Sequence, residues 1–211
     1  MLAEPDLDRL VAACRRLPAT QADFLHVDDL VTNLLLTVLD LQLQTATVER
    51  ALAHYRAKRW DAVRSMQDLQ ALLDRFPDDQ AGNTALAEHL WGYRLWTRAG
   101  LLRGLVQYFA ARGVRSQADL AAWAASSEYE RDFAGQVKGL GLAAYSSLVM
   151  RQGVETIKPD VHVLRFVATV LGRPLAPAEA VTALQEVARV LGLKAYELDW
   201  RIWEHQRGLR V

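Results

Sequence analysis

The stretch that decides the fold is residues 137–166, which read VKGLGLAAYSSLVMRQGVETIKPDVHVLRF. Two glycines one residue apart, Gly139 and Gly141, lie between two helix-forming stretches, residues 128–137 and 142–152. Glycine lets a backbone turn tightly and approach a neighbour with no Cβ in the way. A turn that opens a helix also leaves backbone N–H groups without intrahelical acceptors, so it can bind an anion such as a phosphate. The pattern therefore predicts a tight, anion-binding connection between two helices.

The same stretch contains Asp160, which follows Pro159 and precedes an apolar run. Proline biases the preceding residue, Lys158, away from helical conformation, so a new helix is expected to begin near Asp160 and to end at Gly172. Aspartate is a preferred N-cap residue. The structural interpretation of Asp160 is therefore a helix cap.

Length and composition indicate a globular, largely helical protein. The chain has 211 residues, of which 51% are hydrophobic, enough for one or two domains with a sizeable core. The formal net charge of +0 argues against nucleic-acid binding by bulk charge, although a local basic face would serve. Cys14 is the single cysteine, which excludes a disulfide framework and a four-cysteine cluster.

The sequence offers no membrane segment. No apolar run reaches the roughly 20 residues that a transmembrane helix needs, and no N-terminal segment has the flanks of a signal peptide. We therefore expect a cytoplasmic protein, associated with the nucleoid if it is bacterial.

Apolar periodicity, capping residues and helix breakers predict an all-α chain with no convincing strand and no internal repeat. Residues 30–41 are apolar nearly all round, which is typical of a buried helix. Ser116 is expected to cap one helix and Gly153 to end another. Further helices are predicted over residues 6–17, 48–56, 61–76, 100–112, 114–126, 161–171, 178–190 and 196–206.

The hairpin and the aspartate together resemble the helix-hairpin-helix DNA glycosylases of the endonuclease III superfamily (HhH-GPD). In that family a Leu-Pro-Gly-Val-Gly hairpin is followed fewer than about twenty residues later by an Asp-Thr-His or similar triplet. Here the hairpin is Val-Lys-Gly-Leu-Gly from Val137, and the triplet is Asp160-Val161-His162. The segment from His89 to Ala99 also resembles the adenine-mismatch branch. The chain thus resembles a divergent member that, with one cysteine, lacks the iron–sulfur cluster of some relatives.

The resemblance implies a two-lobed helical fold. Residues 29–154 would form a central bundle that ends in the hairpin, and residues 1–28 plus 155–211 would form the second lobe. The expected partner is double-stranded DNA that contains a damaged or mismatched base, with no membrane partner, and the protein is expected to be a monomer. No cofactor and no metal site are expected, apart from the monovalent cation that often binds the hairpin carbonyls in the family.

The resemblance also assigns roles to residues. Cleavage of an N-glycosidic bond builds positive charge on the sugar, so a nearby carboxylate stabilises the transition state and can orient a water, and Asp160 matches the family's carboxylate. The hairpin would bind the DNA backbone, without reading bases, through main-chain N–H groups. The residues concerned are Lys138, Gly139, Gly141 and Ala143.

A second group of residues would form the base pocket or the wedge that fills the gap left by a flipped base. It comprises Gln42, Arg94, Leu95, Trp96 and Tyr145. The structural alternatives are a polar loop residue for Gln42 and an ordinary core aromatic for Trp96. These residues do not distinguish uracil, an alkylated purine and an oxidised purine.

Bifunctional relatives carry a lysine two residues after the second hairpin glycine, where this chain has Ala143. The pattern therefore predicts a monofunctional glycosylase, although Lys138 or Lys158 could substitute. Lys138 stands where the family has a proline, and Val161 is the middle residue of the triplet. The competing hypotheses are a non-catalytic DNA-binding module of the same fold and a helical interaction protein in which the glycines only make a tight turn.

Overall fold

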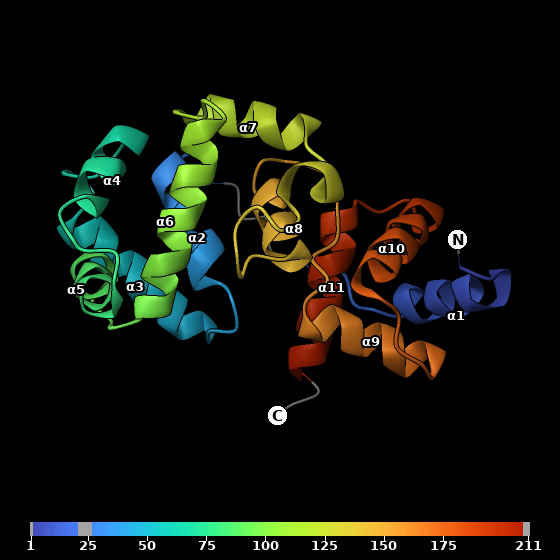
Figure 1. The fold of residues 1–211 in the computed structure, drawn as a ribbon. Coiled ribbons are helices and arrows are strands. Elements are labelled where there is room, and N and C mark those ends of the chain that lie inside the picture. Colours follow the sequence, from blue (N-terminus) through green and yellow to red (C-terminus); the bar gives the residue numbers. More distant parts are fainter. Residues whose placement is uncertain (1, 21–26, 209–211) are drawn as a thin grey trace. The chain divides into compact units, whose positions relative to one another are not determined.

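The described part of the chain, residues 2–20 and 27–208 of a computed structural model, is built of helices and contains no β-strand (Figure 1). The predicted all-α class is confirmed. No helix in these ranges is both long and apolar enough to span a lipid bilayer. Residues 1, 21–26 and 209–211, which the predicted second lobe includes, lie outside the described residues.

The chain divides into two compact units. The described residues 27–148 form one, which we call the central unit, and residues 2–20 and 149–208 form the other, the terminal unit. The helices of the terminal unit are α1 (Glu4–Arg15), α9 (Val161–Leu171), α10 (Pro177–Leu191) and α11 (Ala195–Gly208). Those that begin in the central unit are α2 (Leu30–Leu39), α3 (Thr45–Lys58), α4 (Met66–Leu73), α5 (Gln80–Trp91), α6 (Trp96–Ala111), α7 (Gln117–Ser126), the π-helix η1 (Tyr129–Phe133) and α8 (Leu142–Met150).

The core of the central unit is organised around α2, all of whose residues are buried. It packs against α3, α4 and α6, and α6 packs in turn against α5. The Asp29 side chain accepts a hydrogen bond of 2.6 Å from the Thr32 amide and so caps the helix. The predicted buried helix is confirmed, but it ends at Leu39 because Asp40 leaves the helical conformation (φ −74°, ψ 8°).

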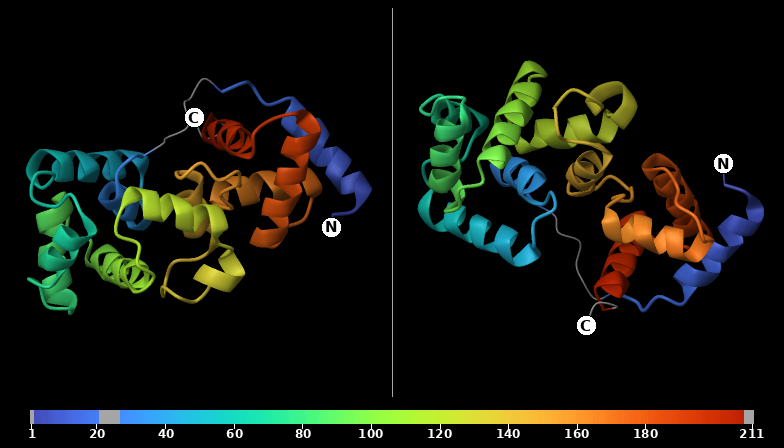
Figure 2. Two further views of the ribbon diagram at one scale, coloured as in Figure 1. Left: turned by 90° about the horizontal axis from the view of Figure 1, so that it is seen from above. Right: turned by 60° about the horizontal axis from the view of Figure 1, so that its bottom comes forward.

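The terminal unit is held by contacts between its first helix and its last three. Leu10 and Cys14 of α1 are fully buried in a cluster with apolar residues of α9, α10 and α11. The side chain of Arg9 donates hydrogen bonds to the carbonyl oxygens of Val170 (2.6 Å) and Leu171 (3.1 Å), which end α9. Figures 1 and 2 show α1 beside α9 and α10. Burial raises the pKa of the Cys14 thiol to about 12, so this cysteine is an apolar core residue.

Two further predicted helices differ more strongly from the structure. The helix expected over residues 61–76 is reduced to α4, because Ser65 and Asp68 form a capping box that fixes its start. The stretch 128–137 contains only the short π-helix η1, in which the Ala134 amide bonds the Tyr129 carbonyl at 2.8 Å. Gly135 then takes a left-handed φ of 72° and the helix ends.

Candidate functional site

The hairpin between η1 and α8 requires glycine at its first position for two reasons. Gly139 has a φ of 91°, which disfavours any residue with a Cβ. A Cβ there would also lie only 2.8 Å from Cδ2 of Leu101 in α6, so the turn sits directly on that helix. The Leu140 amide closes the turn on the Val137 carbonyl at 3.0 Å. The predicted tight connection is confirmed.

Nothing within the described residues demands glycine at the second position. Gly141 has no left-handed φ, and the atom nearest to a Cβ built there is the Tyr129 hydroxyl, 4.0 Å away. Its backbone is exposed, as are Lys138 and Gly139. Gly141 immediately precedes α8, and its carbonyl accepts the Tyr145 amide at 3.1 Å. The first amides of α8, among them that of the half-buried Ala143, have no acceptor within their own helix.

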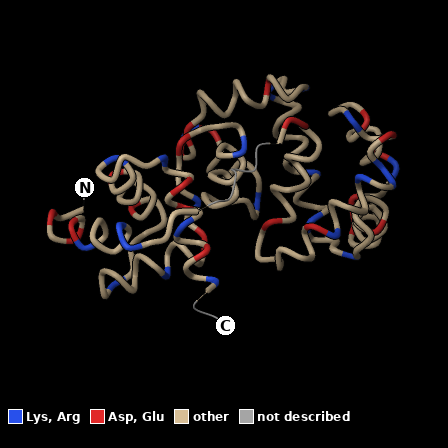
Figure 3. Tube along the Cα trace, turned by 180° about the vertical axis from the view of Figure 1, so that it is seen from behind, with Lys and Arg blue, Asp and Glu red and all other residues tan. Residues whose placement is uncertain are grey.

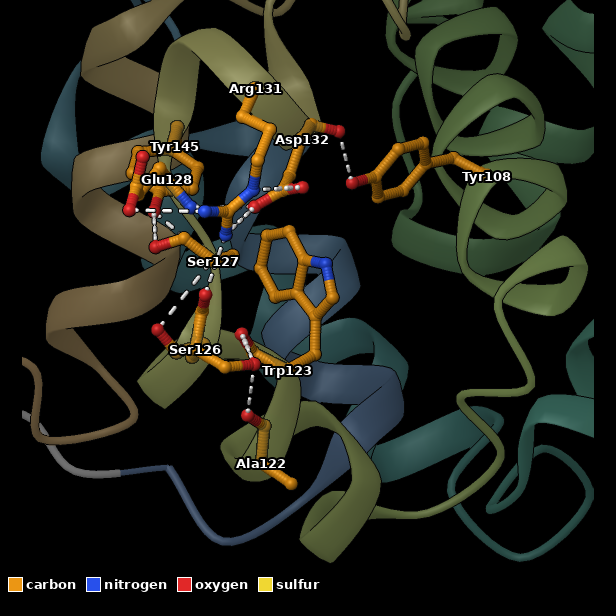
Figure 4. Close-up of polar contacts among 10 residues, drawn as sticks. Tyr108, Ala122, Trp123, Ser126, Ser127, Glu128, Arg131, Asp132 and Tyr145 are labelled. Atoms are coloured by element: carbon orange, nitrogen blue, oxygen red, sulfur yellow. Dashed lines mark hydrogen bonds and ion pairs between the residues drawn. The ribbon is translucent and has the colours of Figure 1, made fainter.

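Tyr145, the predicted pocket residue of α8, lies in the core with only 8% of its surface exposed. Its hydroxyl donates to the Ser127 carbonyl at 2.8 Å and lies 3.0 Å from the Ser127 hydroxyl (Figure 4). Its ring packs against those of Trp123 and Phe133, at centroid distances of 6.0 and 5.6 Å. Burial raises the pKa of the Tyr145 hydroxyl. Tyr145 therefore joins α8 to the segment around η1 and presents little ring surface to a ligand.

A network of charged groups surrounds this tyrosine in Figure 4. The Arg131 guanidinium contacts the carboxylates of Asp132 at 2.7 Å and Glu128 at 3.0 Å, and it also donates to the Ser126 carbonyl at 2.8 Å. The hydrogen bond from the Arg131 side chain lowers the pKa of the half-buried Asp132 carboxyl. The Tyr108 hydroxyl of α6 donates to the Asp132 carbonyl at 2.6 Å. These contacts hold the π-helix, a rare element that often marks functional sites, against the core.

The predicted wedge residues lie in two neighbouring loops of the central unit. Gln42, in the loop between α2 and α3, is exposed and is the one non-glycine residue of the described chain with a positive φ, 58°. The Arg98 side chain of α6 donates to the carbonyl of Leu41, so the start of α6 is tied to this loop. Such backbone strain persists only where surrounding contacts hold it, and it often accompanies function.

The second loop connects α5 to α6. Gly92 takes a left-handed φ of 74°, as a residue that ends a helix often does. Arg94 is exposed, Leu95 is half-buried and Trp96, the first residue of α6, is 43% exposed. The guanidinium of Arg50 in α3 lies 5.9 Å from the ring centre of Tyr93 and brings the start of α3 to the same loop. The structure therefore leaves Gln42, Arg94 and Trp96 exposed in two loops of the central unit, whereas Tyr145 lies in the core.

In the terminal unit, Asp160 caps α9 as predicted. Its Oδ1 accepts hydrogen bonds from the amides of His162 (2.8 Å) and Val163 (3.1 Å). Its Oδ2 accepts no hydrogen bond from the described residues, and the side chain is half-buried. The Asp160 amide donates to the Lys158 carbonyl at 2.8 Å across the buried Pro159. Backbone amides thus fix one carboxylate oxygen, and the other accepts no hydrogen bond within the described residues.

A second carboxyl group holds the same turn. Oδ1 of Asp199 in α11 accepts a hydrogen bond of 2.8 Å from the Lys158 amide. Only 8% of Asp199 is exposed. Burial, together with the negative charge of Asp160, raises the pKa of Asp199 to about 7, against the opposing effect of the Lys158 amide. Sequence reasoning missed this residue. The one available signal was an aspartate between the apolar residues Leu198 and Trp200, within the helix predicted over residues 196–206.

Charge is mixed over both units. Lysine and arginine alternate with aspartate and glutamate along the chain trace in Figure 3, in keeping with the formal net charge of +0. Among the residues that the structure describes, no three histidine, cysteine, aspartate or glutamate side chains are grouped in a way that could hold a metal ion.

No curated protein and no solved structure matches the chain. A family described as a domain of unknown function, DUF8548, matches residues 8–207. The chain belongs to this family.

Proposed function

We propose that this protein is a monofunctional DNA glycosylase, which hydrolyses the N-glycosidic bond of a damaged or mismatched base flipped out of the duplex. The proposal rests on the hydrogen bonding of the Asp160 carboxylate. Its Oδ1 is fixed by two backbone amides, while Oδ2 is free to act on a ligand. A preorganised carboxylate of this kind suits a reaction that develops positive charge on a sugar.

The proposed chemistry needs few groups. As the base departs, the deoxyribose becomes oxocarbenium-like, and Oδ2 of Asp160 stabilises that charge and orients the attacking water. The water adds to C1′, its proton passes to the carboxylate or to solvent, and the base leaves with the bonding electrons. Asp199 is a positioning residue, because its bond to the Lys158 amide fixes the turn that carries Asp160.

DNA binding is assigned to the central unit. The exposed backbone of Lys138, Gly139 and Gly141 and the first amides of α8 would bind a backbone phosphate, as helix N-termini bind anions. The open space around Gly141 supports this, because no contact within the described chain requires a glycine there. The exposed side chains of Gln42, Arg94 and Trp96 would fill the gap beside the flipped base.

The absence of a lysine at the family's nucleophile position supports monofunctional hydrolysis. Ala143 occupies that position in α8. Lys138 and Lys158 are the nearest candidates in sequence for a Schiff base with C1′. Borohydride trapping on an abasic duplex tests this. A monofunctional enzyme gives no covalent protein–DNA adduct, whereas an adduct lost in Lys138→Ala or Lys158→Ala would reassign the enzyme as bifunctional.

The deciding experiment measures base release from duplexes that contain uracil, alkylated purines, oxidised purines or mismatches. It compares the wild type with Asp160→Asn, which keeps an oxygen to cap α9 but removes the negative charge. Asp79→Asn is the matched control, since Asp79 caps α5 through a 2.7 Å bond to the Gly82 amide. Strand cleavage is scored with and without alkali.

We expect one class of substrate to lose its base with the wild type and the control, to be cut only after alkali, and to stay intact with Asp160→Asn. Binding of all three proteins to the same duplexes should be equal. If no substrate is processed while every variant binds DNA, the protein is a non-catalytic DNA-binding module. If none binds DNA, both readings fail.

A further inference from the structure

A cavity of about 450 Å³, open to solvent on one side, lies within the terminal unit, between the C-terminal end of α1 and the sides of α9 and α11. Its volume falls in the range of sites that hold small organic ligands. Leu17, Phe166 and Val170 give it an apolar floor. The His205 ring stands perpendicular to that of Phe166, with centroids 6.2 Å apart, so one wall is aromatic. The cavity takes no part in the proposed base release.

Two arginines at this cavity form no ion pair within the described part of the chain. Arg16 and Arg165 line it, and within the described residues neither guanidinium meets a carboxylate or a carbonyl. Other arginines of the same unit are engaged: Arg9 binds two carbonyls, Arg173 binds Asp6 and Arg189 binds Glu186. None of the described residues lining the cavity is acidic. Two cations with no countercharge favour an anion, and an arginine fork fits phosphate oxygens well.

Gln206 provides an independent observation. It is 5% exposed, it lines the cavity, and its amide makes no hydrogen bond with any described residue. The amide nitrogen and oxygen are not sealed from solvent, so both can bind a ligand that enters the cavity. Because the amide carries a donor and an acceptor side by side, it matches the edge of a heterocyclic base. Phosphate-binding cations, an aromatic wall and an amide pair thus surround one space.

We propose that this cavity binds a nucleotide, with Arg16 and Arg165 on its phosphate, the Phe166–His205 corner against its base and Gln206 on the edge of that base. A free mononucleotide and the 5′-phosphorylated terminal nucleotide of a DNA strand present the same chemistry. The site is separate from the Asp160 turn and does not depend on glycosylase activity.

The test is calorimetric titration of the full chain with the four deoxynucleoside 5′-monophosphates, the matching nucleosides and inorganic phosphate. A short single strand with a 5′-phosphate and the same strand with a 5′-hydroxyl distinguish the two sources. The variants are Arg16→Glu, Arg165→Glu and Gln206→Leu. Arg15→Glu is the matched control, since Arg15 is adjacent in sequence and does not line the cavity. Thermal melts verify that each variant folds.

We expect at least one monophosphate, or the 5′-phosphorylated strand alone, to bind, with the nucleosides and inorganic phosphate much weaker. Because a hydrogen bond to a charged group contributes about 1.5–3 kcal/mol, each arginine variant should lower the affinity by about tenfold or more. Arg15→Glu should leave it unchanged. The proposal is overturned if no phosphorylated ligand binds at millimolar concentration, if inorganic phosphate binds equally well, or if Arg16→Glu and Arg165→Glu bind like the control.

Discussion

The Lys158 amide donates a 2.8 Å hydrogen bond to Oδ1 of Asp199, a buried carboxyl that lies 41 residues further along the chain. Pro159 follows the donor and Asp160 ends the same turn. One aspartate therefore positions the backbone that carries another. Asp199, whose pKa is about 7, therefore lies close enough to the proposed catalytic carboxylate of Asp160 to be affected by its charge. The stability of this unit should accordingly depend on pH.

Asp199→Asn should change the pH dependence of stability. The pKa of Asp199 rises from 3.8 to about 7 on folding, so the folded state retains a proton that the unfolded state has lost. The wild type therefore loses stability as pH rises between those values and reaches a constant penalty above about 7. Asparagine keeps the acceptor for the Lys158 amide and removes the charge. The melting temperature of the variant, relative to the wild type, should rise from pH 4 to pH 7 and then level off.

The control for this experiment is Glu155→Gln, since Glu155 also accepts a backbone hydrogen bond, from the Ala195 amide at 2.7 Å. Melting curves by circular dichroism at half-unit pH steps are sufficient. A difference for Asp199→Asn that is independent of pH, or that the control reproduces, would contradict the assignment of the proton to Asp199.

Two substitutions of Asp160 should separate its capping role from its proposed catalytic role. Asp160→Ala removes the acceptor of two amides and should lower the free energy of unfolding by about 1 kcal/mol, the usual effect of losing an N-cap. Asp160→Asn should stay close to the wild type in urea denaturation and still lose base release. Equal destabilisation by the two variants would show that the charge, rather than the cap, stabilises the helix.

Gly139→Ala should destabilise the central unit more than the same change at Gly135. Both glycines have a positive φ, 91° and 72°, so each substitution incurs about 1–2 kcal/mol of backbone strain. Only at Gly139 does the new Cβ also meet Leu101, at 2.8 Å, whereas Gly135 has open space. Denaturant unfolding gives both values. Equal losses would mean that Leu101 moves aside at no cost.

Gln42 can be tested through its strained backbone. A β-branched residue tolerates left-handed conformation poorly, so Gln42→Val should lower the free energy of unfolding by about 1–2 kcal/mol. Gln44→Val is the control, because Gln44 has extended geometry (φ −67°, ψ 138°) that valine adopts readily. A neutral Gln42→Val would indicate that the loop changes conformation in solution.

Trp96→Ala should weaken DNA binding with little effect on folding. Its side chain is 43% exposed, whereas Trp91, five positions earlier, is fully buried. Stacking of a base on an aromatic ring contributes about 1–3 kcal/mol, so the affinity for a duplex with a flipped or absent base should fall about tenfold. Trp91→Ala should instead reduce stability by about 3–5 kcal/mol. Unchanged affinity of Trp96→Ala, measured by fluorescence anisotropy, would remove Trp96 from the interface.

Local signals allowed much of the fold to be predicted. The Ser116 cap, the Gly153 terminus with its φ of 86° and the Asp160 cap all depend on residues within a few positions of one another, and the structure confirms them. The π-helix was not predictable, because its i+5 hydrogen bonding depends on how Tyr145 and Tyr108 anchor residues 127–132. Local propensity favours an ordinary helix there.

The candidate site was predictable only where a motif marked it. Asp160 and the hairpin glycines stand in a recognisable pattern, whereas Asp199 becomes relevant only because α11 packs beside the turn. The burial of Tyr145 likewise follows from the aromatic cluster around Trp123 rather than from its neighbours in sequence. Side chains whose role depends on distant packing leave no short-range signal.

The composition of the terminal unit, from residues before and after the central unit, also affects the order in which the helices fold during synthesis. The central unit draws its compact structure from consecutive residues and can fold as soon as they leave the ribosome, because domains generally fold as units. Helix α1 is made before the central unit, but the carbonyls that Arg9 binds, those of Val170 and Leu171, emerge some 160 positions later. The apolar face of α1 therefore stays uncovered while the central unit is synthesised. Helix α1 reaches its native contacts only after the central unit has left the ribosome.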